Sequence, residues 1–468
     1  MAVAAGEDFT VAVAEDGSVF SFGTNDYGQL CTGHSIFSSC DPRRVAGLPA
    51  GVLQVAAGGA HTGVVTEAGD LLMCGEGEHG RLGLGDEHDR HTPTMVARAL
   101  FDGEAVLMVA CGYAHTAVVT EGGGVYTFGS GDFGQLGHGD EQEHLLPMRV
   151  PASRFNGERV VMVAAGGGHT VALSGAGHVF TWGQGWRGKL GHNNETTVMV
   201  PLQVDARCFG GGDVVFVAAG QNHTAAVTSE GLLFTWGHGA FGRLGHGDTY
   251  HRLVPTVVGR PAGRVVMVAC GWAHTLVVLH DGALWACGNG HPVRLGLNDR
   301  ADRHVFERVR VEAFGSARVV AAAAGRYHSA AVTEDGALWT WGCGDDGQLG
   351  LGDLEDRLVP ARVTEATRIG RCHLLPEDLV LAFTMGIHDR LGAASPVGTL
   401  AGKSELVSMI AMAGNRWVSG KAGESEGLIR LLGGVSADRR ARYVQKVHHD
   451  STVPNRQPRY CRKCQVPN

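Results

Sequence analysis

No stretch of the 468-residue chain is apolar for long enough to cross a membrane, and the amino terminus, MAVAAGED, lacks the basic segment that opens a secretory signal. The 11 cysteines are odd in number and lack the spacing of a disulfide framework. Several recur at matched positions of a repeat, namely Cys74 with Cys287 and Cys111 with Cys270, which indicates core filler. We therefore expect no membrane span, a reducing environment and a cytoplasmic or nuclear location.

The sequence also lacks the residue patterns of a catalytic centre. No serine–histidine–aspartate or cysteine–histidine arrangement can be assembled from it, so we predict no catalytic residue; enzymatic activity stays open, with its absence favoured. Five segments fit Gly-x-Gly-x-x-Gly, for example 75–80 and 129–134, but each leads into a Leu-Gly pair and a polar loop rather than the helix of a dinucleotide site. We interpret all five as turns, and we expect no cofactor and no metal site.

Acidic residues outnumber basic ones by 47 to 39, which gives a formal net charge of −8. Residues 436–468 hold eight Lys and Arg against two acids, a local charge of +6, so the first 435 residues carry −14. An acidic body is not typical of a domain that binds nucleic acid as a whole. We interpret the basic tail as a solvated segment, and contact with nucleic acid or chromatin is the weaker alternative.

Glycine is abundant, with 72 residues, about twice the average usage. Segments such as VAAGGAHTGVV, starting at Val55, and VACGYAHTAVV, starting at Val109, return along the chain, and a degenerate first copy, VAAGEDFTVAV, starts at Val3. The repeated histidines, spaced 54, 54, 54, 51 and 54 residues apart, are His61, His115, His169, His223, His274 and His328. Seven copies of one unit therefore fill about residues 3–363.

Each unit continues with an apolar strand that ends in an aromatic-Gly pair such as Trp182-Gly183, then a Gly-rich turn, a Leu-Gly pair and a closing short strand. Short strands rich in Val, Ala, Phe and Trp, with glycine at the turns, predict four-stranded antiparallel sheets. One such sheet cannot bury both its faces alone, so we predict an all-β, seven-bladed β-propeller over residues 1–364. The last strand, residues 360–363, has no following unit, and we expect it to complete the first blade by strand exchange.

The His-Thr and His-Ser pairs recur at one position of the unit, and we interpret them as architectural rather than metal-binding or catalytic. Six occurrences at a single position indicate a requirement of every blade. We expect the imidazole and hydroxyl groups to form hydrogen bonds with backbone groups of nearby loops, which satisfies buried polar atoms.

The pattern VAAG-x-x-HT, aromatic-Gly, GQLG-x-GD and P-x-x-V resembles the repeats of the regulator of chromosome condensation family, over about residues 3–363. The resemblance implies a seven-bladed propeller with strand closure between its first and last blades. It does not imply a single function. Members of the family include a guanine-nucleotide exchange factor for the GTPase Ran that also binds chromatin, plant ultraviolet-B photoreceptors, arms of HECT-type ubiquitin ligases, and scaffolds on membranes or cilia.

Three features of the chain narrow this range. The near-constant repeat length leaves no inserted hairpin like the wedge of the Ran exchange factor, and the pentamers that match the photoreceptor's repeated GWRHT segments hold one tryptophan, Trp272. A HECT catalytic domain would need several hundred further residues. We therefore predict a protein–protein interaction scaffold or adaptor. The alternative is a guanine-nucleotide exchange factor for a small GTPase, or a substrate-recruiting component of a ubiquitin ligase, with a small GTPase or ubiquitin machinery as the partner.

Loops that depart from the repeat are the candidate partner-binding positions, because core positions repeat and loops vary. Trp186 and Arg187 stand in such a loop of the fourth copy, and Tyr250 is an aromatic candidate in the fifth. The sixth copy has the strongest local charge, and arginine is enriched at protein–protein hot spots. Its predicted partner-face residues are Arg300, Arg303, Arg308 and Arg310. Whether these share a side of the propeller with Trp186 and Tyr250 stays open at this point.

After Thr364 the repeat stops. We predict a small α-helical segment over residues 365–468, with helices that begin near Leu375 and Ser404 and a basic tail. Three roles stay open for it: a separate module, a segment docked on the propeller, or a binder of a partner helix. Cys461 and Cys464 have half of a common zinc-site spacing, but no second pair follows, so we predict no zinc site.

Overall fold

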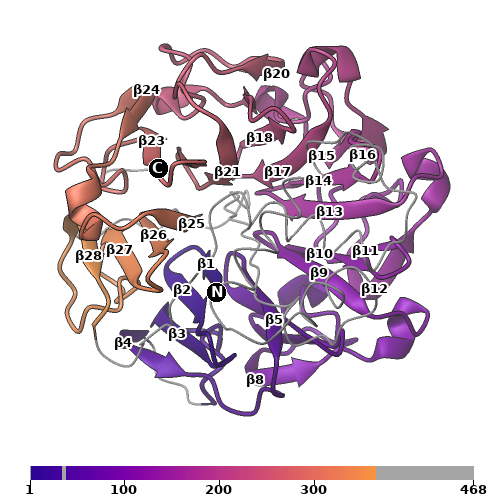
Figure 1. The fold of residues 1–468 in the computed structure, drawn as a ribbon. Coiled ribbons are helices and arrows are strands. Elements are labelled where there is room, and N and C mark those ends of the chain that lie inside the picture. The colour runs from indigo at the N-terminus through magenta and orange to yellow at the C-terminus, as the bar shows by residue number, and fades with distance from the viewer. Residues whose placement is uncertain (1, 34–37, 365–468) are drawn as a thin grey trace, which may run out of the picture.

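The computed structural model describes residues 2–33 and 38–364, which form seven four-stranded antiparallel sheets arranged as the blades of a ring (Figure 1). The predicted seven-bladed β-propeller is therefore confirmed. The helices predicted for residues 365–468, together with Cys461 and Cys464, lie outside the described residues. In the part of the chain that is described, no helix combines the length and the apolar character needed to span a membrane.

Each blade takes its four strands from one stretch of chain, in sequence order. The first strands are β1 (Ala2–Ala5), β5 (Val52–Ala57), β9 (Val106–Cys111), β13 (Val160–Ala165), β17 (Val214–Ala219), β21 (Val265–Cys270) and β25 (Val319–Ala324). The second strands are β2 (Phe9–Val13), β6 (His61–Thr66), β10 (His115–Thr120), β14 (His169–Ser174), β18 (His223–Thr228), β22 (His274–Leu279) and β26 (His328–Thr333). The third strands are β3 (Val19–Thr24), β7 (Leu71–Gly75), β11 (Val125–Gly129), β15 (Val179–Gly183), β19 (Leu233–Gly237), β23 (Leu284–Gly288) and β27 (Leu338–Gly342). The fourth strands are β4 (Ser38–Arg44), β8 (Arg90–Met95), β12 (His144–Val150), β16 (Val198–Gln203), β20 (Arg252–Val257), β24 (Arg303–Arg308) and β28 (Arg357–Arg362).

Short 3₁₀ turns join these strands. Those after third strands are η1 (Glu78–Gly80), η4 (Trp186–Gly188) and η6 (Ala240–Gly242). Those before the first strand of the next blade are η2 (Arg98–Phe101), η3 (Ala152–Phe155), η5 (Ala206–Phe209) and η7 (Val311–Phe314). Because η1, η4 and η6 fall within Gly-x-Gly-x-x-Gly segments, these segments are turns, as predicted, and do not open a dinucleotide-binding helix.

The first strands of neighbouring blades contact one another around the axis, and the fourth strands form the rim (Figure 1). The second strands are buried along their whole length, whereas a fourth strand such as β12 is largely exposed. Valine and alanine dominate the inner strands because those strands are covered on both faces by adjacent blades. The core is therefore shared between blades, and no blade has a core of its own.

A histidine and a hydroxyl group connect neighbouring blades. Thr170 Oγ1 of blade 4 donates to the backbone oxygen of Gln135 in blade 3 (2.7 Å), so its oxygen is left to accept a hydrogen bond from His115 Nε2 of blade 3 (2.9 Å). Six of the seven junctions contain this bond, at 2.9–3.0 Å: His61–Thr116, His115–Thr170, His169–Thr224, His223–Thr275, His274–Ser329 and His328–Thr10. The prediction of a backbone partner is confirmed for the hydroxyl, but it is wrong for the imidazole, which bonds to that hydroxyl.

Backbone groups connect the blades as well. Near the axis, the loop between the first and second strands donates an N–H to the next blade, as Trp272 N does to Gly325 O (3.2 Å). Nearer the rim, the loop between the third and fourth strands does the same, as Gly139 N does to Met199 O (2.9 Å). Both bonds are present at all seven junctions. Each blade is therefore fixed to the next by hydrogen bonds at two radii.

The Leu-Gly and aromatic-Gly pairs pack against each other across the same junctions. A Cβ on Gly137 of blade 3 would lie 2.7 Å from Trp182 Nε1 of blade 4, and one on Gly350 of blade 7 would lie 2.8 Å from the ring of Phe22 in blade 1. Both glycines have positive φ, at 83° and 65°. The glycine is thus required because the aromatic ring of the next blade lies directly on the backbone.

The predicted closure by strand exchange is wrong. Strand β28, which contains most of the segment assigned to the first blade, pairs with β27 of its own blade, and β1 to β4 complete blade 1 without it. Blades 7 and 1 instead meet through the ordinary junction bonds, including His328 Nε2 with Thr10 Oγ1 (2.9 Å) and Gly352 N with Cys40 O (2.9 Å). Each repeat starts with an inner strand and ends with a rim strand, so seven whole repeats close the ring laterally.

The junction of blades 1 and 2 differs from the others. Phe9 stands where the other blades have the histidine, so the histidine–hydroxyl bond is missing there, while Thr62 Oγ1 still donates to Gln29 O (2.7 Å). Cys31 and Cys74 take the places of the junction glycine and aromatic residue, and they form a disulfide between the two blades with Cα atoms 5.7 Å apart. The interpretation of Cys74 as core filler is therefore wrong, because Cys74 is bonded to Cys31 of the neighbouring blade. Cys111, Cys270 and Cys287 are buried and form no disulfide with one another, as filler residues would be.

Burial determines the charge state of the junction histidines. It lowers the pKa of His115 to about 3, with a smaller contribution from Arg81, and it lowers the pKa values of His61, His169 and His223 well below 6.5. These imidazoles are neutral in the folded protein near neutral pH. Nε2 donates to the hydroxyl, and the buried Nδ1 of His115 has no hydrogen-bond partner among the described residues, so protonation would place an N–H there without an acceptor.

We predict that His115→Phe lowers the free energy of unfolding by about 1–2 kcal/mol, because it removes one junction hydrogen bond while Thr170 keeps its carbonyl acceptor. Phe9 shows that a phenyl ring fits this position of the blade. Chemical denaturation followed by tryptophan fluorescence measures the change. An unchanged midpoint would show that the bond contributes nothing.

We predict that stability falls as pH falls from about 6.5 towards 3. The unfolded chain binds protons on its histidines below about pH 6.5, whereas the folded chain does not until near the lowered pKa values, so acid favours unfolding. The contribution of the neutral histidines to stability is fully present above about pH 6.5. Denaturation series at several pH values should show a shallower dependence for His115→Phe, by about one proton. Parallel curves for the variant and the wild type would contradict this assignment.

Candidate protein-interaction face

One end of the propeller carries the loops between first and second strands and the loops between third and fourth strands. The six junction histidines begin their strands at this end, and we call it the histidine face. The junction is the same in almost every blade, but the loops at this end differ in sequence from blade to blade. This face can therefore give the protein its binding specificity.

One position on this face varies in charge from blade to blade. It is the residue before the Leu-Gly or equivalent pair, whose carbonyl accepts the junction hydroxyl in every blade: Gln29, Arg81, Gln135, Lys189, Arg243, Arg294 and Gln348. The glutamines accept a bond from their own turn, as Gln135 Oε1 does from Phe133 N (2.8 Å). The cations reach instead to the next blade, as Arg243 Nη1 does to Trp272 O (2.8 Å). All four cations are almost completely buried.

The buried cations differ in their counter-charges. Arg81 forms ion pairs with Glu76 and Glu78 of its own blade. Lys189 Nζ contacts only amide oxygens, those of Gln184 (2.5 Å) and Asn222 (2.6 Å). Arg243 donates to backbone oxygens. Among the residues that the structure describes, neither Lys189 nor Arg243 has an ion-pair partner, so blades 4 and 5 hold two adjacent buried positive charges without a carboxylate.

The pKa values reflect this accumulation of positive charge. Burial lowers the pKa of Lys189 to about 7, and burial together with Arg294 lowers that of Arg243 to about 9. His238 lies at the same place, and burial, followed by Arg243 and the neighbouring His251, lowers its pKa to about 3. An anion brought to this place would favour the charged forms of all three groups.

Aromatic rings accompany the cations. The guanidinium carbon of Arg326 lies 4.4 Å from the ring centre of Trp272 and 4.8 Å from that of Tyr327, and that of Arg294 lies 5.0 Å from Tyr327. Arg326 also forms an ion pair with Glu7, across the junction of blades 7 and 1. Stacking of this kind fixes the planes of guanidinium groups and leaves their edges for hydrogen bonds.

A second aromatic group lies between blades 4 and 5. Trp186 contacts His238 edge to face at 5.2 Å, and His238 contacts His251 at 4.9 Å. The Arg187 guanidinium lies 4.6 Å from the Trp186 ring centre and donates from Nη1 to His251 Nε2 (2.9 Å). Trp186 is 41% exposed although it makes these contacts. The group combines an exposed aromatic surface with fixed cationic groups.

The structure places the predicted site residues at both ends of the propeller. Trp186, Arg187 and Tyr250 lie in loops between third and fourth strands and therefore share the histidine face, and Tyr250 is 74% exposed. Arg300 and Arg303 lie at the same end in blade 6. Trp186 and Arg187 are in direct contact in blade 4, whereas Arg300 and Arg303 lie two blades further along the ring.

The four arginines of blade 6 do not form one patch. Arg303 pairs with Gly288, at the end of β23 on the histidine face, whereas Arg308 pairs with Trp285 near the opposite end, and Arg310 follows it. Arg303 is also held by Asp299 (2.6 Å) and Glu307 (2.7 Å). A single partner surface can therefore include Arg300 and Arg303 or Arg308 and Arg310, and the binding role of each pair stays a prediction.

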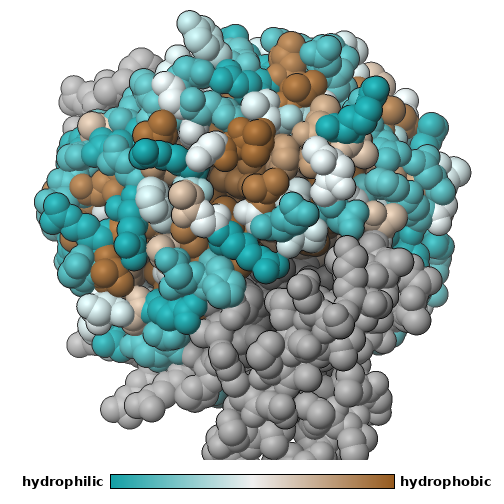
Figure 2. All heavy atoms as spheres, turned by 45° about the horizontal axis from the view of Figure 1, so that its top comes forward, coloured by the Kyte–Doolittle hydropathy of each residue, from teal (hydrophilic) through white to brown (hydrophobic). Residues whose placement is uncertain are grey.

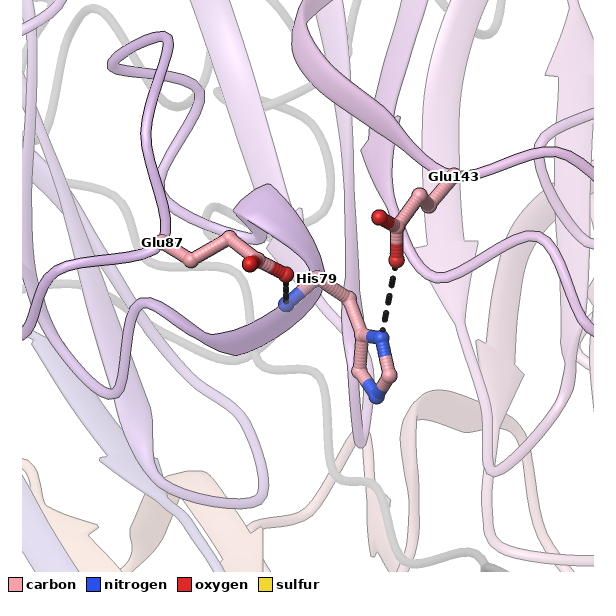
Figure 3. Close-up of side chains that lie close together, drawn as sticks. All are labelled: His79, Glu87 and Glu143. Atoms are coloured by element: carbon pink, nitrogen blue, oxygen red, sulfur yellow. Dashed lines mark hydrogen bonds and ion pairs between the residues drawn. The ribbon is translucent and has the colours of Figure 1, made fainter.

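A group of possible metal ligands has a structural explanation. His79 Nδ1 of blade 2 hydrogen-bonds to Glu143 Oε2 of blade 3 (3.0 Å), and Glu87 Oε1 accepts from His79 N (3.0 Å), as Figure 3 shows. In blade 4, Glu195 caps Arg187 N in the same way (3.2 Å). We interpret the group as a turn cap combined with a contact between blades.

A second such group, Cys343, Asp345 and Asp356, lies in blade 7. Asp356 accepts from Gly344 N (3.2 Å) and from Arg300 Nη2 of blade 6 (3.3 Å). These contacts again cap a turn and join two blades, which is the arrangement found around His79. Neither group therefore leads to a metal-site proposal.

Exposed apolar side chains are dispersed. Figure 2 shows the side of the molecule near β20 and β24, where hydrophobic residues form small patches among hydrophilic ones. Val257 of β20 is 51% exposed and Val305 of β24 is 37% exposed. Scattered apolar residues of this size are normal on a protein surface, so the described residues on this side form no broad hydrophobic interface.

Sequence reasoning missed Arg243, Arg294 and Arg326 as site residues. The first two replace the glutamine of the GQLG pattern, and Arg326 replaces a residue of the HT pentamer, so departures from the repeat were visible in the sequence. The sequence did not show that these residues belong to one site, because only the fold brings the varied positions of different blades to one face. Nor did it show which of these arginines lacks an ion-pair partner, because a partner can come from a loop of another blade.

Comparisons with known proteins agree with this architecture. The family model of the RCC1-like domain matches residues 38–375, and the model of the regulator of chromosome condensation (RCC1) repeat matches residues 2–29. The ultraviolet-B receptor UVR8 of Arabidopsis thaliana is 38% identical over 318 residues, which cover 67% of this chain and 70% of that protein. The human E3 ubiquitin-protein ligase HERC2 is 33% identical over 384 residues, which cover 79% of this chain but 8% of the ligase.

Solved structures share the fold. Human WBSCR16 matches with a TM-score of 0.67 and 26% identity, over 74% of this chain and 94% of that chain. Prp20p of Saccharomyces cerevisiae matches with a TM-score of 0.66 and 24% identity, over 78% of this chain and 88% of that chain. The latter likeness supports the propeller fold alone.

Proposed function

The chain belongs to the family of RCC1-like propellers, and from this premise we propose that it is a protein–protein interaction module that presents its histidine face to a partner protein. Relatives in this family include a ubiquitin ligase and a light receptor, so the fold alone supports a role in protein interaction without fixing the partner. The face, not the fold, supplies the specificity.

The concentration of aromatic and cationic side chains on the histidine face carries this proposal. Trp272 and Tyr327 hold Arg326 between them near the axis, and Trp186 and Tyr250 are exposed in the outer loops. Tryptophan, tyrosine and arginine are the residues most enriched at protein–protein hot spots. The histidine face has these residues on a rigid scaffold, which lowers the entropy lost on binding.

The regular blades favour an interaction module over a nucleotide exchange factor. Across residues 2–33 and 38–364, every strand belongs to a four-stranded blade, and no additional hairpin projects from one. Exchange activity by a wedge would need such an element. A small GTPase or ubiquitin machinery remains a partner that a binding experiment would identify.

We predict that Trp272→Gln combined with Tyr250→Ala abolishes capture of the partners that the full chain binds in a lysate, as identified by mass spectrometry after crosslinking. Gln221 occupies the position of Trp272 in blade 5, and Tyr250 is exposed, so both substitutions should preserve the fold. Thermal unfolding of the variant checks this.

The matched control is Arg308→Ala with Arg310→Ala, at the other end of the propeller, which should leave capture unchanged. Loss of partners with the control variant and retention with Trp272→Gln/Tyr250→Ala would place binding on the opposite end and overturn the proposal. A captured nucleotide-free GTPase would direct further work to a GDP-release assay, and captured ubiquitin machinery to substrate recruitment.

A further inference from the structure

We propose that the surface between blades 4 and 5, formed by Trp186, Arg187, His238 and Phe241 next to the buried cations Lys189 and Arg243, binds a carboxylate side chain in an acidic segment of the partner protein. This inference rests on the proposed function and names the chemistry of the partner and the place where it binds.

The charge of this surface is not balanced within the described part of the chain. Lys189 and Arg243 occupy equivalent positions of adjacent blades, and both are almost completely buried without an ion-pair partner. A buried charge costs free energy unless it is paired. At the same position of blade 2, Arg81 is paired with Glu76. The fold can therefore supply its own carboxylate to a cation at this position, and within the described residues it does not do so for Lys189 and Arg243.

The polar contacts also leave bonding capacity for an anion. An arginine has five N–H donors, and the bonds of Arg243 use Nε, to Ala240 O (3.1 Å), and Nη1, to Trp272 O (2.8 Å). These two bonds orient the guanidinium group without occupying Nη2. The N–H donors of Nη2 can therefore bind a carboxylate oxygen with little loss of side-chain entropy.

Exposed aromatic side chains flank the cations. Trp186, in η4, is 41% exposed, and Phe241, in η6, is 42% exposed. The Arg187 guanidinium lies against the Trp186 ring (4.6 Å), and that of Arg243 lies 5.7 Å from the ring centre of Phe241. Apolar residues next to the bound acid can pack on these rings. The combination suits a segment in which acidic and apolar residues alternate.

The charge of the whole body favours a protein segment over a nucleic acid. Residues 1–435 carry −14, so a long polyanion would be repelled outside this small cationic surface. An isolated carboxylate flanked by apolar residues meets the cations without that repulsion. A nucleic-acid partner is therefore an outcome that the test below would expose as a failure of the proposal.

The test uses the full chain and a short fluorescein-labelled peptide of alternating glutamate and leucine, with binding followed by fluorescence anisotropy. The double variant Lys189→Gln/Arg243→Gln introduces the residue that the chain itself has at this position in blades 1, 3 and 7. We expect it to weaken binding by about tenfold or more. Trp186→Ala, which introduces the residue of blade 5 at that position, should weaken binding less.

Three controls make the result specific. Arg81→Gln removes a cation from the same repeat position in blade 2 and should leave binding unchanged, Lys189→Arg should retain it, and a peptide with glutamine in place of glutamate should not bind. Equal loss with Arg81→Gln, binding of the glutamine peptide, or tighter binding of single-stranded DNA would each overturn the proposal. So would a wild-type chain that fails to bind the acidic peptide. The proposed role of the histidine face fails separately, if Trp272→Gln/Tyr250→Ala still captures the partners and Arg308→Ala/Arg310→Ala loses them.

Discussion

The bond between a neutral histidine of one blade and a hydroxyl of the next is the interaction on which the ring depends. His115 donates to Thr170 because the threonine proton is already bonded to a backbone carbonyl, and burial keeps the imidazole uncharged. The same geometry at six junctions fixes the angle and spacing of the blades. Even the closing junction, His328 with Thr10, uses it, so the first and last repeats meet as any two neighbours do.

This constraint determines where variation is permitted. The carbonyl that accepts the hydroxyl bond belongs to the main chain, so its side chain is free to be glutamine in blade 3, lysine in blade 4 or arginine in blade 5. The repeat therefore builds a constant junction and, at the same residue, a variable face. In this chain, blades 4, 5 and 6 have a cation at this position. Two of these cations, Lys189 and Arg243, have no carboxylate partner among the described residues.

The fold could be predicted from the sequence because seven copies of one unit show which residues recur at each position. Its strands, turns and architectural histidines could be predicted from periodicity and glycine placement, and the structure confirms them. Strand exchange was wrong because sequence order alone does not show which edge of a blade a strand occupies. The disulfide of Cys31 and Cys74 was missed because only the structure shows that the two positions they occupy, those of the junction glycine and the aromatic residue, face each other across neighbouring blades. The face around Arg243 was missed for a related reason: pairing of charges between blades is a property of the closed ring.

A double-mutant cycle on His115→Phe and Thr170→Val tests the central bond most directly. The two side chains meet only across the junction of blades 3 and 4, so their coupling free energy isolates the contact. A coupling of about 1 kcal/mol or more near neutral pH is the result that this account predicts. Additive effects of the two substitutions would contradict it, because the blades would then be held together by packing without the histidine–hydroxyl bond.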